Sequence, residues 1–324
     1  PFGAVLGLTA DRGNNIAHLR YFYPTARQRK RTAYKCHYIH HWRTYSNMAA
    51  DAQTERSIQL MENRKNILVT ENLGIGYSGK NSVTIAQDIN MSLKEGSLNA
   101  LIGANGIGKS TLLRTLTGIQ PPLSGTVLLN GKSLPSYPAK ELAQHLSIVL
   151  TESLPPSNLT VFELVALGRQ PYTNWLGSLS GEDLAQVEKA LQLTQIDHLS
   201  HRRHHEISDG QLQKVLIARA LAQDTPLIIL DEPTTHLDLL HKANLLRLLK
   251  KLAAEAGKCI LYSTHDLDLA LQMSDEIIVM NGRETIQGTP QDLVAQKTFD
   301  TLFDDPDIIF DPDKGRFIIR DENV

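Results

Sequence analysis

The chain has 324 residues, of which 41% are hydrophobic, and its 33 basic and 35 acidic side chains leave a formal net charge of −2. This composition describes a globular protein with enough apolar residues for one large or two small domains. Two cysteines and the lack of any run of about 18 apolar residues exclude a disulfide framework and a membrane-spanning segment, so we expect a reducing cytosolic compartment and a peripheral role at any membrane.

The N-terminal segment differs in composition from the rest of the chain. Residues 1–47 carry eight basic side chains against one acidic, hold eight of the eighteen aromatic residues, and show no helical or strand periodicity. A nucleic-acid-binding arm and an Arg-rich transit peptide are alternatives for such a composition. We interpret residues 1–60 as a basic, aromatic-rich extension outside the functional body, either disordered or translated upstream of a true start at Met48 or Met61.

Regular organisation begins near residue 66. β-branched residues and turn punctuation predict antiparallel strands at 67–69, 83–85 and 126–129. Apolar spacing predicts helices near 140–146, 160–168, 183–193, 211–222 and 238–253. Ser180 and Asp183 are placed like a capping box before the third of these helices. The pattern predicts an α/β fold with a helical insertion.

A phosphate-binding loop lies between an apolar strand at 98–102 and a helix that opens at Thr111. Its sequence, Gly-Ala-Asn-Gly-Ile-Gly-Lys-Ser-Thr, follows the spacing G-x-x-x-x-G-K-S. Glycines let successive backbone N–H groups point at phosphates, and the helix N-terminus adds its positive end. We predict that Lys109 neutralises the β- and γ-phosphates and that Ser110 binds Mg²⁺, so the chain binds ATP or GTP. The predicted phosphate-binding residues are Gly103, Ala104, Asn105, Gly106, Ile107, Gly108, Lys109, Ser110 and Thr111.

A second nucleotide motif follows at 227–232, where an apolar strand ends in two carboxylates. The end of a buried strand can place Asp231 beside Mg²⁺, and Glu232 just beyond it can polarise the water that attacks the γ-phosphate. A core strand that merely ends in a solvated acidic turn is the alternative, and the P-loop upstream argues against it.

Five motifs stand in the order found in ABC-type ATPases, which the chain resembles over about residues 66–290. These motifs are the P-loop, Ser208-Asp209-Gly210-Gln211, Asp231-Glu232, Thr235-His236-Leu237-Asp238 and Ser263-Thr264-His265-Asp266. The resemblance implies a P-loop NTPase core of the ABC type, with an antiparallel β subdomain and a helical subdomain at about 153–206. It also implies head-to-tail pairing, in which Ser208, Gly210 and Gln211 of one copy close over the ATP held by a second copy.

The same resemblance assigns three further residues. By position, Tyr77 resembles the aromatic residue that stacks on adenine, Asp238 the loop residue that communicates between the paired sites, and His265 the switch histidine on the γ-phosphate. A tyrosine packed at a strand edge is the alternative for Tyr77. The preference for ATP over GTP depends on the resemblance alone.

Two departures from the family pattern concern metal and phosphate contacts. Thr151 and Glu152 stand where the family usually has a glutamine. A carboxylate can still bind Mg²⁺, so we retain Glu152 as a nucleotide and Mg²⁺ ligand and expect Glu152→Gln to preserve hydrolysis; a loss beyond about tenfold would show that the acid is needed. Ile207 and Asp209 replace the commoner leucine and glycine of the signature, whereas Gly210 is retained, so close approach to a phosphate stays feasible.

The stretch 159–171 resembles importers of iron-siderophore, haem and cobalamin complexes, which carry Thr-Val-x-Glu-Leu-Val and then Gly-Arg-x-Pro. This implies a polytopic permease as partner, a substrate-binding protein as an indirect one, no nucleic acid, and a peripheral place on the cytoplasmic face of the inner membrane. The ATPase subunit of another importer or of an exporter is the main alternative. A non-transport ABC protein of ribosomes or DNA is disfavoured by the single P-loop and the short insertion.

Two remaining stretches carry weaker signals. The histidines at 198, 201, 204 and 205 have a spacing that could gather a transition metal on a helix, but Arg202 and Arg203 interrupt them, so we favour an exposed connector. Residues 276–290 predict the closing hairpin of the catalytic domain. Residues 291–324 are interpreted as a small accessory segment without an assigned function.

Overall fold

The computed structural model describes residues 64–79, 82–150, 157–235, 237–302, 308–311 and 316–319. All of them belong to one unit of the chain, Arg64–Val324. The predictions for residues 1–60 and for Glu152 therefore lie outside the described residues. Within the described ranges, no helix is long and apolar enough to cross a membrane.

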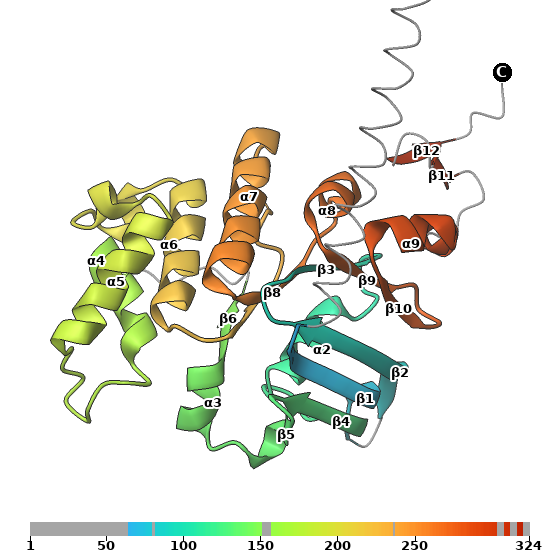
Figure 1. Ribbon diagram of the computed structural model, residues 1–324, viewed down its shortest axis with the longest axis horizontal. Coiled ribbons are helices and arrows are strands. Elements are labelled where there is room, and N and C mark those ends of the chain that lie inside the picture. The colour runs from blue at the N-terminus through green and yellow to red at the C-terminus, as the bar shows by residue number, and fades with distance from the viewer. Residues whose placement is uncertain are drawn as a thin grey trace, which may run out of the picture. The chain divides into compact units, whose positions relative to one another are not determined.

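The first sheet is antiparallel and contains the three predicted strands. Its order is β2-β1-β4-β5, with β1 at Asn66–Tyr77, β2 at Val83–Lys94, β4 at Ser124–Leu129 and β5 at Lys132–Ser133. Val69 of β1 lies opposite Ser92 on one side and Leu128 on the other. β2 is thus an outer strand of this sheet, with β1 on one side only (Figure 1).

The second sheet has the order β10-β9-β3-β8-β7-β6, and its strands run parallel except for the antiparallel β10. Its strands are β3 at Leu98–Gly103, β6 at Leu146–Val149, β7 at Leu227–Leu230, β8 at Cys259–Ser263, β9 at Glu276–Met280 and β10 at Thr285–Gly288. The predicted hairpin of β9 and β10 is confirmed. Because β3, β7 and β8 run parallel, their carboxyl ends meet at one edge of the sheet, where three of the sequence motifs begin.

Side chains along β3 alternate between two hydrophobic clusters, as the two-residue period of a strand requires. Leu101 packs with α2 (Lys109–Leu116) and with the antiparallel sheet. Ala100 and Ile102 pack on the other face, with α7 (Leu239–Ala256) and α8 (Leu267–Met273). The six-stranded sheet is therefore covered on both faces, which explains its continuous apolar strands.

The helical subdomain follows β6 in the chain and packs on α6. Its helices and those of the neighbouring connections are η1 at Leu134–Ser136, α3 at Ala139–His145, α4 at Val161–Ala166, η2 at Leu167–Arg169, α5 at Gly181–Leu193, η3 at Asp197–Leu199, η4 at His204–Glu206 and α6 at Asp209–Ala222. The predicted capping box at α5 is confirmed, since Ser180 Oγ accepts a hydrogen bond from the N–H of Asp183 at 3.2 Å. Figure 1 shows α4, α5 and α6 side by side.

The Gly-Arg pair of the Gly-Arg-x-Pro motif joins these helices. A Cβ on Gly168 would lie 2.2 Å from the carbonyl oxygen of Arg219 in α6, so only glycine fits there. The buried guanidinium of Arg169 donates from Nε to Asp183 Oδ1 of α5 at 2.8 Å and from Nη1 to the carbonyl of Ala222 in α6 at 2.8 Å. The pair therefore connects η2 to both α5 and α6.

The described residues after β10 extend the main core. They form α9 at Pro290–Ala295, η5 at Thr298–Thr301, β11 at Ile308–Asp311 and β12 at Arg316–Ile319. Phe299 and Phe310 are buried in the cluster that covers the six-stranded sheet, with ring centroids 4.9 Å apart, and Phe317 lies 5.2 Å from Phe310. The part of the accessory segment that the structure describes is thus joined to the main hydrophobic core by aromatic packing.

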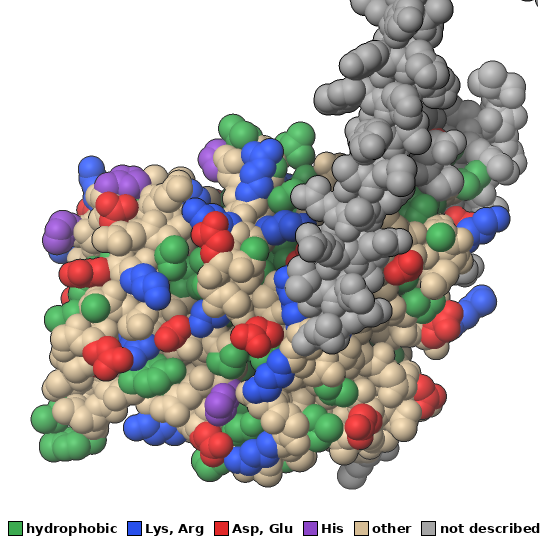
Figure 2. Space-filling model, viewed as in Figure 1, with side chains coloured by type: hydrophobic (Ala, Val, Ile, Leu, Met, Phe, Trp, Pro, Cys, Tyr) green, Lys and Arg blue, Asp and Glu red, His purple; other side chains and the backbone are tan. Residues whose placement is uncertain are grey.

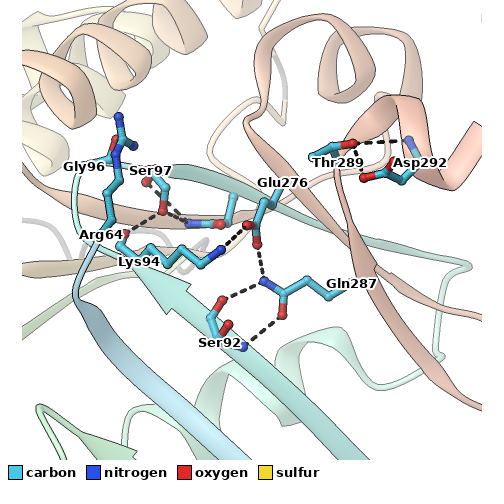
Figure 3. Close-up of polar contacts among 10 residues, drawn as sticks. Arg64, Ser92, Lys94, Gly96, Ser97, Glu276, Gln287, Thr289 and Asp292 are labelled. Atoms are coloured by element: carbon cyan, nitrogen blue, oxygen red, sulfur yellow. Dashed lines mark hydrogen bonds and ion pairs between the residues drawn. The ribbon is translucent and has the colours of Figure 1, made fainter. Parts of the chain in front are cut away.

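A polar junction joins the two sheets, and Figure 3 shows its side chains. Lys94 of β2 forms an ion pair with Glu276 of β9 at 3.0 Å. Gln287 of β10 bonds to Glu276 and contacts Ser92 twice, accepting from its N–H at 2.9 Å and donating to its carbonyl at 2.6 Å. This junction fixes β2 against β9 and β10.

Candidate active site

The P-loop connects β3 with α2 and passes close to two strands. Gly106 and Gly108 have φ values of 76° and 112°, a region that favours glycine. A Cβ on Gly108 would lie 2.3 Å from Cγ2 of Ile85 in β2, and one on Gly103 would lie 2.7 Å from the carbonyl oxygen of Met280 in β9. Neighbouring strands, as well as any bound phosphate, thus require glycine at these positions.

The N-terminus of α2 has the features of an anion site. Its N-cap residue is Gly108, which supplies no side-chain cap. The first backbone N–H groups of the helix are therefore open to an external acceptor such as a phosphate. Ser110 and Asn105 are exposed beside them, Ala104 and Ile107 are partly buried, and Thr111 is buried.

Lys109 is folded back onto its own loop. The side chain is buried, and Nζ donates to the carbonyl oxygens of Gly103 at 2.9 Å and Ala104 at 3.2 Å. Burial lowers the pKa of Lys109, while the nearby carboxylates of Glu232 and Asp231 oppose this change. A buried ammonium held by carbonyl oxygens can exchange those acceptors for phosphate oxygens.

Asp231 follows β7 and is held by a hydroxyl from the neighbouring strand. Its side chain is 8% exposed, and Oδ1 accepts a hydrogen bond from Ser263 Oγ at 2.7 Å. The same hydroxyl accepts a bond from the backbone N–H of Glu232 at 2.8 Å. Ser263 at the end of β8 thus orients both acidic residues.

Glu232 has an unusual backbone and a carboxylate bonded at both oxygens. Its φ of 46° lies in the left-handed region, which costs a non-glycine residue on the order of 1 kcal/mol. Oε1 contacts Nε2 of His265, and Oε2 accepts from Thr235 Oγ1 at 3.2 Å. The backbone therefore aims Glu232 at His265, the residue assigned to the γ-phosphate.

Asp238 is the N-cap of α7. Its Oδ1 accepts the backbone N–H of His241 at 2.8 Å and lies 2.8 Å from Nδ1 of the same residue. The backbone hydrogen bond, followed by the side-chain one, lowers the pKa of Asp238. Its carboxylate is exposed.

The signature residues cap α6 and lie near the Asp238 loop. Ser208 Oγ accepts the N–H of Gln211 at 3.3 Å, and Gln211 Oε1 accepts the N–H of Ser208 at 2.9 Å. A Cβ on Gly210 would lie 3.4 Å from Cδ2 of Leu237. Within the described ranges, no hydrogen bond or ion pair joins these residues to the P-loop of the same chain, and Figure 1 shows α6 and α2 in different parts of the fold.

Tyr77 at the end of β1 borders a hollow beside the P-loop helix α2. The side chain is 51% exposed, and its hydroxyl lies 3.4 Å from Thr111 Oγ1 in α2. The hollow has a volume of about 340 Å³ and is lined by Gly76, Tyr77, Ser78, Arg114, Ile119, Gln120 and Pro121. An exposed aromatic ring next to the P-loop helix suits stacking on a base.

The oxygens available at the site suit Mg²⁺. Ser110 offers a hydroxyl and Asp231 a carboxylate, which are the hard ligands that Mg²⁺ prefers alongside water and phosphate. Among the described residues, no group of three or more His, Cys, Asp or Glu side chains is placed to hold a metal on its own. Such a site fits a cation that arrives with the nucleotide. The histidines near 198–205 form no such group, and His204 is buried with Nδ1 3.3 Å from Ser157 Oγ.

Sequence reasoning did not assign a role to Ser263 or Arg169. Ser263 begins the motif Ser263-Thr264-His265-Asp266, in which the resemblance assigns a role to the histidine. Arg169 belongs to the Gly-Arg-x-Pro motif, which indicates a subfamily. Only the three-dimensional contacts show that the first orients the acidic residues and that the second holds helices together.

Known proteins share this arrangement. The profile of the ABC transporter family matches residues 86–235. The achromobactin transport ATP-binding protein of Dickeya dadantii is 39% identical over 76% of this chain and 91% of its own length. The iron(3+)-hydroxamate import ATP-binding protein of Bacillus subtilis is 40% identical over the same shares, 76% and 91%.

Solved structures agree with this likeness. A metal-chelate type ABC transporter in an inward-facing conformation matches with a TM-score of 0.65 and 30% identity, over 74% of this chain and 89% of that one. A bacterial ABC transporter cassette solved as a dimer matches with a TM-score of 0.60 and 28% identity, over 69% and 98%. The predicted ABC-type fold is therefore confirmed.

Proposed function

The chain belongs to the ABC transporter family, and on this premise we propose that it is the ATP-hydrolysing subunit of an importer for an iron-siderophore complex. One observation carries the ATPase part: Lys109, Asp231 and Glu232 lie at the carboxyl edge of one sheet, with His265 in contact with Glu232. The siderophore part is supported by the names of the relatives and by the resemblance of residues 159–171. Haem and cobalamin are the alternative cargoes that this resemblance allows.

In the proposed hydrolysis, each side chain at this edge of the sheet has a separate role. Lys109 and the backbone N–H groups at the start of α2 hold the phosphates. Ser110 and Asp231 would hold Mg²⁺, which supplies charge neutralisation on the phosphate oxygens. Glu232 orients and polarises a water molecule for attack on the γ-phosphorus while His265 contacts the γ-phosphate. The bond from that phosphorus to the bridging oxygen breaks, which leaves ADP and inorganic phosphate.

A second copy of the domain completes the proposed site. Among the residues that the structure describes, no hydrogen bond or ion pair joins Ser208, Gly210 or Gln211 to the P-loop of the same chain, which leaves them available to the ATP of another copy. Leu239 and Leu240 follow Asp238 at the start of α7 and are 72% and 65% exposed. Two adjacent exposed leucines are unfavourable in water and suit a surface that the second copy covers.

The proposed partner in the membrane is a polytopic permease. Tyr77 would stack on the base, and the family resemblance makes ATP the proposed nucleotide. Glu152, if it acts as the family's glutamine does, would couple that nucleotide to the permease. The subunit would sit peripherally on the cytoplasmic face of the membrane, with a substrate-binding protein as an indirect partner and no nucleic acid. Another importer class or an exporter is the second candidate.

Co-purification tests the proposal directly. Tagged Glu232→Gln protein, which should bind ATP without hydrolysing it, is isolated from its native membranes with MgATP, and its partners are identified by mass spectrometry. A polytopic permease, followed by loss of radiolabelled ferric-siderophore uptake in cells that carry only this variant, is the expected result. Recovery of ribosomes or DNA without a permease would contradict it. Lys109→Ala protein serves as the control that cannot hold the nucleotide.

A further inference from the structure

The contacts between the first turn of α7 and Asp266 have no role in the site described above. Lys242 Nζ donates to both carboxylate oxygens of Asp266, at 2.9 and 3.2 Å. The side chains are only 23% and 35% exposed, so water and salt screen this ion pair less than one on the open surface. Thr234 Oγ1 lies 3.4 Å from the same carboxylate.

These contacts connect both ends of one loop to one residue. Thr234 precedes the loop that ends at Asp238, and Lys242 follows it, with its backbone N–H bonded to the carbonyl of Asp238 at 2.9 Å. Asp266 comes directly after His265, whose ring contacts Glu232. A shift of the loop therefore pulls on the residue next to His265.

The segment that holds His265 is itself anchored to the P-loop strand. The N–H of Thr264 bonds to the carbonyl of Leu101 in β3 at 3.1 Å, and the N–H of Asp266 bonds to Thr264 Oγ1 at 3.0 Å. Because Thr264 is fixed to β3, a displacement of the Asp266 backbone by its ion pair is taken up at His265, the residue between them. Figure 1 shows α7 and α8 next to each other, and this segment directly precedes α8 in the chain.

We propose that Lys242 and Asp266 are positioning residues that couple the Asp238 loop to His265. Contact of a second copy with Asp238 and the neighbouring leucines fixes the start of α7, and the ion pair transmits that position to His265 and so to Glu232. Hydrolysis then becomes fast only when the second copy is in place. The inference rests on the proposed function, because it assumes that the Asp238 loop meets a second copy.

Another lysine of the same helix provides a matched control. Lys250 Nζ donates to the carbonyl of Met273 at the end of α8 at 2.7 Å and lies 3.5 Å from Asp275. It joins α7 to the end of α8 but touches neither the Asp238 loop nor His265. A purely structural role of Lys242 predicts that the two lysines behave alike when they are replaced.

The test measures steady-state ATPase activity of the full-length protein over a range of MgATP concentrations. We expect Lys242→Met and Asp266→Asn to lower kcat about tenfold, as is typical for loss of coupling, and to bring the Hill coefficient from between 1 and 2 to about 1. KM for ATP stays near the wild-type value. Lys242→Arg restores kcat and the Hill coefficient, and Lys250→Met keeps both.

Two results would overturn the inference. One is an unchanged Hill coefficient and kcat in Lys242→Met; the other is an equal loss in Lys250→Met, with matching decreases in the melting temperature. Failure of the proposed function has a different signature. In that case the wild-type protein shows no cooperative hydrolysis, and Glu232→Gln stays monomeric in saturating MgATP. There is then no coupling between two copies for the ion pair to transmit.

Discussion

The nucleotide edge of the six-stranded sheet and the helical subdomain differ in how they use their side chains. At the nucleotide edge, Lys109, Asp231 and Glu232 are each bonded by neighbours from the loop or from adjacent strands. Among the described residues of the helical subdomain there are a buried ion pair and several capping boxes, but large apolar groups such as Trp175, at 90%, and Leu176, at 66%, are exposed.

This difference separates chemistry from recognition. Groups that act on a phosphate must be oriented in advance, so their partners are already present in the fold. Groups that contact another protein have no partner until it arrives, so they remain exposed. Figure 2 shows apolar side chains at the surface of the helical subdomain, at lower left.

The largest expected effect tests whether the two regions are independent. Lys109→Ala removes the only ammonium of the P-loop, and we expect ATP hydrolysis to fall by about 10²–10³-fold or more, a loss typical of one key charge-stabilising group. The stability of the helical subdomain stays unchanged. An ATPase assay measures the loss of hydrolysis, and urea unfolding measures the stability. Lys132→Ala in the antiparallel sheet is the control. Unfolding of the helices in Lys109→Ala would show that the regions depend on each other.

The second prediction concerns the junction inside the helical subdomain. Gly168→Ala places a methyl group against the carbonyl of Arg219, so η2 and α6 must separate, and we expect a loss of about 1–3 kcal/mol of unfolding free energy. Gly181→Ala, at a glycine with no atom within 4 Å of its Cβ position and no left-handed backbone, is the spatial control. Urea denaturation compares the two variants. Equal stabilities of wild type and Gly168→Ala would refute the close contact.

The third prediction separates the two groups of exposed apolar residues. In the Glu232→Gln background with MgATP, we expect Leu239→Ser with Leu240→Ser to raise the dimer dissociation constant at least about tenfold, because burial of each leucine contributes about 1.5–3 kcal/mol. Trp175→Ser with Leu176→Ser should leave that constant unchanged and weaken the permease association instead. Sedimentation analysis measures the dimer dissociation constant, and co-purification measures the association with the permease. If both pairs weaken the dimer equally, the proposed division of surfaces is wrong.

The smallest expected effect is a pH dependence in the helical subdomain. Hydrogen bonds from Ser180, and then Arg169, hold the pKa of Asp183 below its ordinary value of 3.8. Because the pKa of Asp183 is lower in the folded state, the ionised carboxylate stabilises the fold at any pH above its pKa in the unfolded chain. This contribution is lost as the pH falls through the pKa of the folded state. Ser180→Ala should therefore lower stability by about 1 kcal/mol at pH 7 and by less below about pH 4. Urea unfolding at pH 7 and below about pH 4 measures the stability of Ser180→Ala relative to the wild type, and Ser178→Ala is the control. A stability difference that does not change with pH would contradict the expectation.

The sequence predicted the fold class well because its signals are local. Strand alternation, helical spacing and capping residues are all set within a few residues, and the structure has the corresponding elements. The P-loop and the Asp231-Glu232 strand end are likewise contiguous motifs, so their meeting at one sheet edge follows from parallel strands.

Long-range contacts were beyond such reasoning. Ser263 lies 32 residues from Asp231, and Lys242 lies 24 residues from Asp266. Serine and lysine are common residues, so the position of one in the sequence does not indicate which distant residue it will contact. The left-handed backbone of Glu232 is equally hidden, because no residue type that favours this conformation marks it.

Gln287 covers part of the outer edge of β2. An outer strand such as β2 offers unpaired N–H and carbonyl groups that can recruit a strand from another molecule and begin aggregation. The side-chain amide of Gln287 bonds to both the N–H and the carbonyl of Ser92, as a neighbouring strand would. One amide group therefore closes part of that edge, and its loss would expose a template for intermolecular β-pairing during expression and storage.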